Sequence, residues 1–169
     1  MVLIIYLRLL LGAGATFRKS SHRPGSLPLL ITIMILLSQS RSQPLFEPLA
    51  IPAAVLAAAA LVLFQWATNS IQGKFFSYLG DDDIPQFVFQ GGPFAYVRNP
   101  FYASYILTNT AVAMAYPSWI GGGAALVSIA ILWAAALYEE RKFARSPCAA
   151  EHQLYIQRTG RFLPRLSHG

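Results

Sequence analysis

Two short polar stretches of this chain hold side chains suited to binding a charged or polar ligand. The first runs from Arg98 to Tyr102 (Arg-Asn-Pro-Phe-Tyr) and offers a planar guanidinium, an amide and an aromatic hydroxyl. The second is the carboxylate pair Glu139-Glu140. One glutamate can pair with an arginine while the other holds a cationic or hydroxyl-bearing group of a ligand. These residue types therefore favour a binding site over a purely structural surface.

An apolar hairpin separates the two polar stretches. Its arms are Phe101–Tyr116 and Ile120–Tyr138, hinged at Pro117-Ser118-Trp119. Since two antiparallel helices return the chain to the side where it started, we expect both polar stretches on one side of a membrane and at one depth. Polar clusters at that depth are costly and usually functional.

The composition indicates a membrane protein. Hydrophobic residues make up 55% of the 169 residues and charged residues only 12%, against about 25% charged in a soluble domain. The single cysteine, Cys148, excludes an intrachain disulfide, and no Cys/His cluster predicts a metal. The net charge of +6 does not predict nucleic-acid binding, because the basic residues flank apolar segments and form no stripe of their own.

Five apolar stretches occur along the chain. Val2–Phe17, Leu27–Leu37 and Pro48–Ala67 precede the two arms of the hairpin. A membrane-spanning helix needs roughly 20 apolar residues, so Leu27–Leu37 is short for a full span. Val2–Phe17 could instead be a signal peptide, but its basic cluster follows the apolar block, which is the wrong order for cleavage.

The sequence therefore predicts an all-α integral membrane protein, multi-pass, with about five transmembrane helices and a helical C-terminal tail. We divide it into N-terminal membrane helices, residues 1–68, and a C-terminal region, residues 69–169. The C-terminal region consists of a loop, the hairpin 101–138 and the tail 139–169. The sequence does not predict the oligomeric state.

The distribution of basic residues predicts the orientation. With the N-terminus outside and five alternating spans, Arg8 falls within a span and Arg41 outside, so 11 of the 13 Lys and Arg residues lie inside. Positive residues favour the cytoplasmic side. Both polar stretches and the tail are therefore expected at the cytoplasmic face.

The loop from Asn69 to Asn99 contains two further features. Asp81-Asp82-Asp83 could be a metal site, but a solvated acidic turn is the favoured interpretation because no second ligand cluster accompanies it. Phe87-Val88-Phe89 and the following Gly91-Gly92-Pro93 are typical of a short extended piece entering a tight turn.

Each functional interpretation has a simpler alternative. Arg98 can be a membrane-surface anchor, Asn99-Pro100 a helix start and Tyr102 an interfacial aromatic residue. Glu140 can pair with the basic residues just downstream or lie on a solvated helix end. His152 can accept a proton, although a lone histidine usually does not.

These residues resemble a known family. Gly92 to Tyr102, the hairpin, Glu139 to Phe143 and the tail motif Arg161-Phe162-Leu163-Pro164 are similar to the isoprenylcysteine carboxyl methyltransferase family and the wider group that includes phospholipid N-methyltransferases. The resemblance covers about residues 86–164.

The resemblance implies S-adenosylmethionine as cofactor, bound at the cytoplasmic face under the folded tail, with a lipophilic substrate entering from the membrane. Carried onto this chain, it implies that catalysis depends on Arg98, Tyr102 and Glu140. The implied cofactor-binding residues are Gln86, Phe87, Val88, Phe89, Phe94, Asn99, Pro100, Phe101, Tyr102, Glu139 and Glu140.

The chain departs from the family pattern in four places. Asn99 replaces the usual histidine and Phe143 the usual leucine, and residues 146–152 differ from the usual tail. Ala134-Ala135-Ala136 occupy the turn where the eukaryotic prenylcysteine enzymes carry an arginine thought to meet the substrate carboxylate, which disfavours a prenylcysteine substrate.

The leading hypothesis is therefore a membrane methyltransferase acting on a lipid-soluble carboxylate, amine, thiol or phenol. The alternative is a non-catalytic membrane partner that kept the family fold. A reductase is a minor third possibility, because membrane sterol reductases share a similar C-terminal part but are larger.

Overall fold

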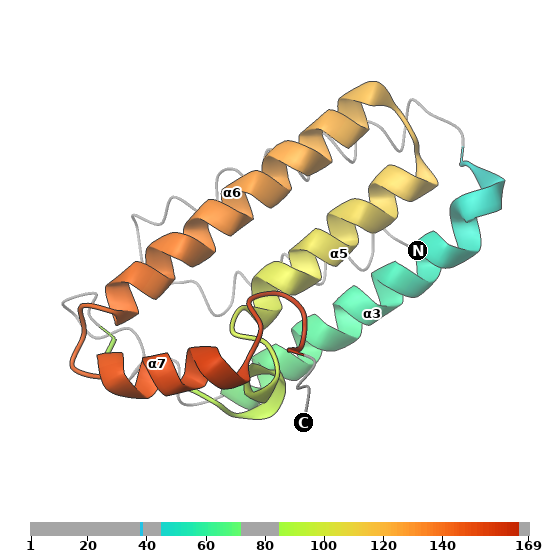
Figure 1. Ribbon diagram of the computed structural model, residues 1–169. Helices are drawn as coiled ribbons and strands as arrows, with labels where there is room; N and C mark the ends of the chain where they lie inside the picture. Colours follow the sequence, from blue (N-terminus) through green and yellow to red (C-terminus); the bar gives the residue numbers. More distant parts are fainter. Residues whose placement is uncertain (1–37, 39–44, 72–84, 166–169) are drawn as a thin grey trace. The chain divides into compact units, whose positions relative to one another are not determined.

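The computed structural model describes residues 45–71 and 85–165, together with Ser38, and every regular element among them is helical (Figure 1). The elements are α3 (Glu47–Ile71), the short 3₁₀ helix η1 (Gly92–Ala95), α5 (Pro100–Ala115), α6 (Trp119–Phe143) and α7 (Ala149–Arg158). The predicted all-α class is confirmed for these residues. Val2–Phe17, Leu27–Leu37 and Asp81-Asp82-Asp83 lie outside the described residues.

Two of the described helices, α3 and α6, are long and apolar enough to cross a membrane. Only 22% and 28% of their most apolar windows are buried inside the structure, so most of the side chains in these windows are not covered by other described elements. The 16 residues of α5 fall below the roughly 20 that a span needs. The structure thus supports two candidate spans, and the five-helix topology stays a prediction.

Local sequence explains where the hairpin helices begin and end. Pro100 begins α5, a position that suits proline because no hydrogen bond is lost there. Ser118 caps α6, since its Oγ accepts a hydrogen bond from the Gly121 amide at 2.9 Å. The helix continues past Tyr138 to Phe143. Glu139 and Glu140 therefore lie on its last turns, not on a separate tail.

The described residues form two compact units, which we treat separately. The first comprises residues 45–62 and 104–132. Its α3 part buries small side chains at helical spacing, namely Ala53, Ala57 and Ala60. Small residues let helix backbones approach closely where lipid removes most of the hydrophobic driving force. One polar pair crosses this unit, because Asn109 Nδ2 on α5 donates to Ser128 Oγ on α6 at 2.7 Å.

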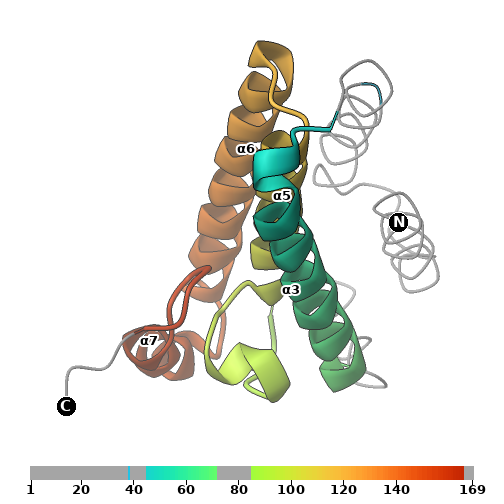
Figure 2. The ribbon, with the colours of Figure 1, turned by 90° about the vertical axis from the view of Figure 1, so that its right-hand side faces the viewer.

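The second unit comprises residues 63–71, 85–103 and 133–165. Its apolar core contains Val88, Phe143, Cys148 and Tyr155. Within this unit α7 lies beside the end of α6 and runs obliquely to it (Figure 1), and Figure 2 views α7 nearly end-on.

A glycine is required at the turn that enters η1. Gly92 has a φ of 57°, and a Cβ at this position would lie 1.9 Å from Ser70 Oγ on α3. The turn therefore packs directly against the last turns of α3.

Candidate functional site

All the candidate residues predicted from the sequence lie in the second unit, and the structure joins Arg98 to Glu140. Arg98 Nε donates to Glu140 Oε1 at 3.0 Å. Arg98 Nη1 also donates to the main-chain carbonyls of Thr159 and, at 3.4 Å, of Ile156. Arg98 thus connects the start of α5, the end of α6 and the end of α7.

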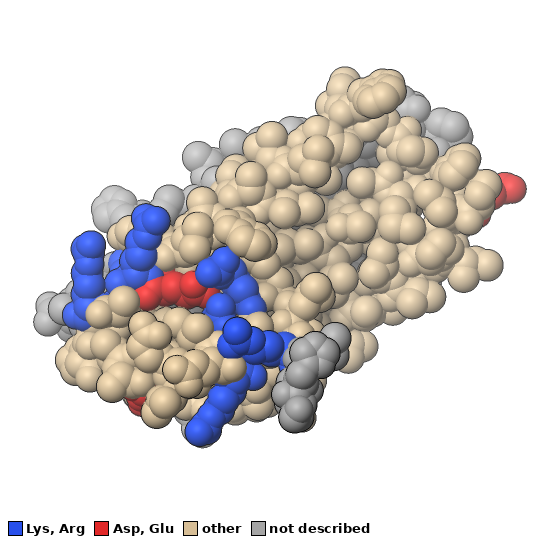
Figure 3. Space-filling view, viewed as in Figure 1, with Lys and Arg blue, Asp and Glu red and all other residues tan. Residues whose placement is uncertain are grey.

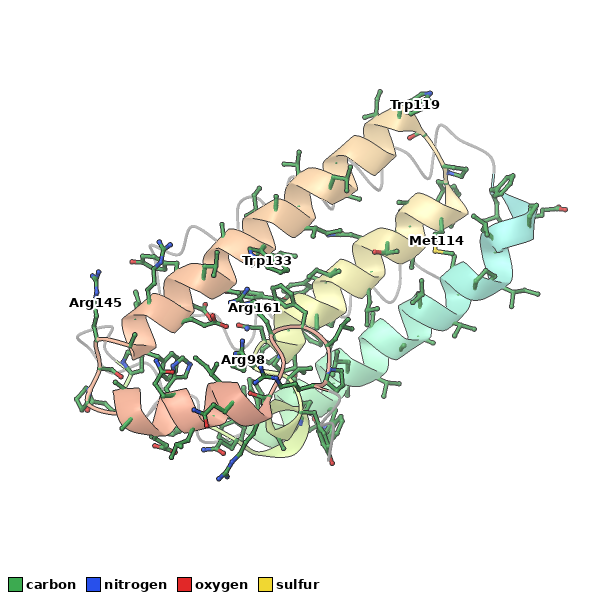
Figure 4. The ribbon with its side chains drawn as sticks, viewed as in Figure 1. Arg98, Met114, Trp119, Trp133, Arg145 and Arg161 are labelled. Carbon is green, nitrogen blue, oxygen red and sulfur yellow. The ribbon has the colours of Figure 1, made fainter. Side chains whose placement is uncertain are left out.

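Arg161 is a second partner of Glu140 that was absent from the predicted site residues. Its Nε and Nη2 donate to Glu140 Oε1 and Oε2 at 3.0 and 2.7 Å, a bidentate pair. Figure 4 shows Arg161 and Arg98 close together, with Trp133 beside Arg161. The Arg161 guanidinium lies 5.0 Å from the Trp133 ring centroid, a cation–π contact.

Arg161 also fixes the backbone of the first polar stretch. Its carbonyl accepts hydrogen bonds from the Asn99 amide at 3.1 Å and from Asn99 Nδ2 at 3.3 Å. The one sequence signal for Arg161 was its place in the Arg-x-x-Pro motif. The side-chain amide of Asn99 thus donates a hydrogen bond that holds the tail at Arg161.

The three ionic side chains are largely shielded from solvent. Arg98, Glu140 and Arg161 are 10%, 16% and 24% exposed in their side chains. The alternative in which Glu140 pairs with the basic residues just downstream is not what the structure shows, because its partners come from positions 98 and 161. The hydrogen bonds to Glu140 raise the pKa of Arg161. With two guanidinium groups and one carboxylate, the cluster carries a net charge of +1.

The neighbouring carboxylate is placed differently. Glu139 is exposed, and its Oε1 accepts a hydrogen bond from the Tyr102 hydroxyl at 2.6 Å. The two adjacent glutamates therefore have different partners. Glu140 pairs with Arg98 and Arg161, whereas Glu139 accepts a hydrogen bond from the Tyr102 hydroxyl at the surface.

Aromatic side chains continue from the same region. Phe94 makes edge-to-face contacts with Phe89 and Phe101, at centroid distances of 5.2 and 6.1 Å. Phe101 contacts Phe64 at 5.4 Å. Among the other predicted cofactor-binding residues, Val88 and Pro100 are buried, Phe87 is half-buried and Gln86 is exposed.

The tail packs against residues 94–98 in spite of the altered residues 146–152. The Tyr155 hydroxyl donates to the Phe94 carbonyl at 2.6 Å, and burial raises the pKa of Tyr155 to about 12, which keeps the hydroxyl protonated. The Arg98 amide donates to the Gly160 carbonyl at 2.8 Å, and Val97 and Gly160 form a parallel bridge. The substituted residues have local partners of their own: Ser146 Oγ donates to the Phe143 carbonyl at 2.7 Å.

His152 is built into this packing. It is 4% exposed, and its ring stacks on Phe143 at 4.5 Å with an interplanar angle of 18°. Burial is the main cause that lowers the pKa of His152; Arg98 lowers it further and Glu140 partly opposes the shift. A neutral, buried and stacked imidazole favours a packing role over proton acceptance.

Comparison with protein-family models matched residues 49–146 to the family described as phospholipid methyltransferase. The match spans more than half of the chain and includes both polar stretches and the hairpin between them, whereas Arg161 and α7 lie beyond it. Comparisons with curated proteins and with solved structures gave no match. The resemblance drawn from the sequence is confirmed at the level of the wider group, and the chain belongs to the phospholipid methyltransferase family.

Proposed function

We propose that this protein transfers a methyl group from S-adenosylmethionine to a lipophilic acceptor in the membrane, at the cytoplasmic face. The observation that carries the proposal is the convergence of the two polar stretches. Arg98 with Glu140, and Tyr102 with Glu139, join the start of α5 to the end of α6 within one unit. Family membership supports methyl transfer as the reaction.

The residues present fit this cofactor chemically. When bound, S-adenosylmethionine supplies an activated methyl group on a cationic sulfonium. Carboxylates and aromatic faces stabilise such a cation, and the exposed carboxylate of Glu139 lies beside Tyr102. The net positive cluster around Glu140 suits a carboxylate group of a ligand.

The proposed role of the chain is positioning. Arg98, Glu140 and Arg161 hold α5, α6 and the tail in fixed register through three hydrogen bonds to one carboxylate. Methyl transfer depends on alignment and dry surroundings more than on acid–base help. A rigid ionic cluster is the kind of support that such alignment needs.

The acceptor is proposed as a lipid-soluble amine, carboxylate, thiol or phenol. Family membership supports a lipid. The alanines at 134–136 supply no cation on their turn of α6, which speaks against a prenylcysteine carboxylate.

The testing experiment is calorimetric binding of S-adenosylmethionine and S-adenosylhomocysteine to the detergent-purified protein. Glu139→Gln is the informative variant, because Glu139 is exposed and its replacement keeps the side-chain shape. We expect its Kd for S-adenosylmethionine to rise about tenfold, equivalent to about 1.4 kcal/mol. The Kd for S-adenosylhomocysteine should change less, because its sulfur is a neutral thioether and not a sulfonium.

Glu151→Gln is the matched control, since Glu151 is also exposed and hydrogen-bonded, to Gln90 at 3.1 Å. It should leave both affinities unchanged. Absence of any cofactor binding by a folded wild-type protein would overturn the proposal and favour the non-catalytic membrane partner.

A further inference from the structure

The end of α6 and the residues after it carry arginines that have no acidic partner among the described residues. Arg141, Arg145 and Arg158 are exposed, and none has an acidic partner among residues 45–71 and 85–165. In contrast, Arg98 and Arg161 pair with Glu140, and Arg165 donates to the carbonyls of Ile156 and Gln157. Figure 3 shows blue side chains gathered over α7 and the end of α6.

Apolar side chains are exposed in the same region. Leu154 on α7 is 54% exposed, and Leu163, just after α7, is 75% exposed. Leu154 and Arg158 are four residues apart and therefore share one side of the helix. The side that carries His152, Tyr155 and Thr159 is buried in the unit. The helix is thus amphipathic, with a packed side and a second side that combines a leucine with an arginine.

The position of α7 suits a membrane surface. It lies beside the end of α6, which is one of the two candidate spans (Figures 1 and 2). Side chains at the end of a span lie at the depth of the lipid head groups. Leucines at that depth can enter the acyl boundary while arginines contact phosphate oxygens.

We propose that the surface formed by the end of α6, α7 and the residues after it binds anionic lipid head groups of the bilayer in which the protein sits. Arg141, Arg145 and Arg158 provide the charge, and Leu154 and Leu163 insert between the lipids. The occupant is an anionic bilayer because three cations without acidic partners in the described part of the chain lie beside exposed leucines and complement negative head groups. The proposal depends on membrane placement and does not require methyl transfer.

The experiment uses the full chain, one copy per nanodisc, with an environment-sensitive fluorophore at Leu163→Cys in a Cys148→Ala background. That background removes the single natural cysteine. Discs contain phosphatidylcholine alone or with about a third phosphatidylglycerol. We expect blue-shifted emission and quenching by brominated lipid in the anionic discs, both reversed by high salt.

The charge variants test the residues directly. Arg145→Gln and Arg158→Gln should each weaken the preference for anionic lipid about fivefold, the effect of about one surface cation. Glu151→Gln, on the exposed side of the same helix, is the control of opposite sign and should not weaken it. Thermal unfolding in detergent verifies that each variant is folded.

Three outcomes would overturn the proposal. The first is equal fluorescence in neutral and anionic discs. The second is an unchanged preference for anionic lipid in the Arg145→Gln and Arg158→Gln variants. The third is a blue shift that occurs only with two copies per disc, which would assign this surface to a second copy of the chain. Cofactor affinity, measured separately, distinguishes these failures from a failure of the proposed methyl transfer.

Discussion

The two units of this protein are held together by different kinds of contact. The first unit packs small side chains such as Ala57 and Ala60, with one polar pair between Asn109 and Ser128. The second unit gathers charged and aromatic side chains around one carboxylate, Glu140. The difference implies that single changes in the second unit should have large effects, whereas the first unit should tolerate them better.

The largest expected effect is that of Glu140→Ala. The change leaves the mostly shielded guanidinium groups of Arg98 and Arg161 without their counter-charge, which should destabilise the protein by about 3 kcal/mol. Thermal unfolding in detergent measures it. A loss below about 1 kcal/mol would show that the ionic cluster does not hold the second unit together.

Gly92→Ala should cost about 2 kcal/mol in the same unit. Alanine is strained at a φ of 57°, and its Cβ would meet Ser70 Oγ. The double variant Gly92→Ala with Ser70→Gly removes the contact with the Ser70 side chain and keeps the backbone strain. It should therefore unfold at a higher temperature than Gly92→Ala, after correction for Ser70→Gly alone, and equal stability would contradict the close packing of this turn on α3.

The polar pair of the first unit should contribute less, about 1 kcal/mol. Asn109→Ala, Ser128→Ala and the double variant form a thermodynamic cycle that isolates the hydrogen bond between them. Interhelical hydrogen bonds in membrane proteins average about 0.6 kcal/mol. A coupling energy larger than the loss of stability caused by Glu140→Ala would reverse the contrast between the units.

The smallest effect concerns pH. The pKa of His152 is lowered from its ordinary value of 6.5 in the folded state. Below pH 6.5 the unfolded chain therefore binds more protons than the folded chain. Stability should therefore be complete above that pH and fall as the pH decreases through the lowered pKa. His152→Phe, which retains a ring against Phe143, should reduce this acid dependence, and an unchanged pH profile would contradict the burial of a neutral imidazole.

Much of the second unit was predictable from local sequence. The sequence predicted the two polar stretches, the hairpin between them and the family resemblance. These features depend on proline, glycine and paired charges, which have strong local preferences. The sequence also predicted that one of the paired glutamates would pair with an arginine, without indicating that it would be Glu140. The cofactor positions, the orientation and the division at residue 68 stay predictions.

The sequence did not indicate which arginine Glu140 would meet. Basic residues lie just downstream at 141, 142 and 145, yet the bidentate partner is Arg161. Local charge spacing favours partners on the next helical turn. Here α7 and the turn after it return the chain to the end of α6, and a long-range contact replaces the local one.

The sequence by itself determined the helical class, the apolar helices and the residue types at both polar stretches, because these follow from composition and local conformational preference. The tertiary structure alone decided how the two adjacent glutamates differ. Glu140 is enclosed between Arg98 and Arg161, whereas Glu139 is exposed beside Tyr102. Neighbouring side chains on a helix point about 100° apart, so which one meets the tail depends on the packing of α6 against α7 and not on the sequence of α6.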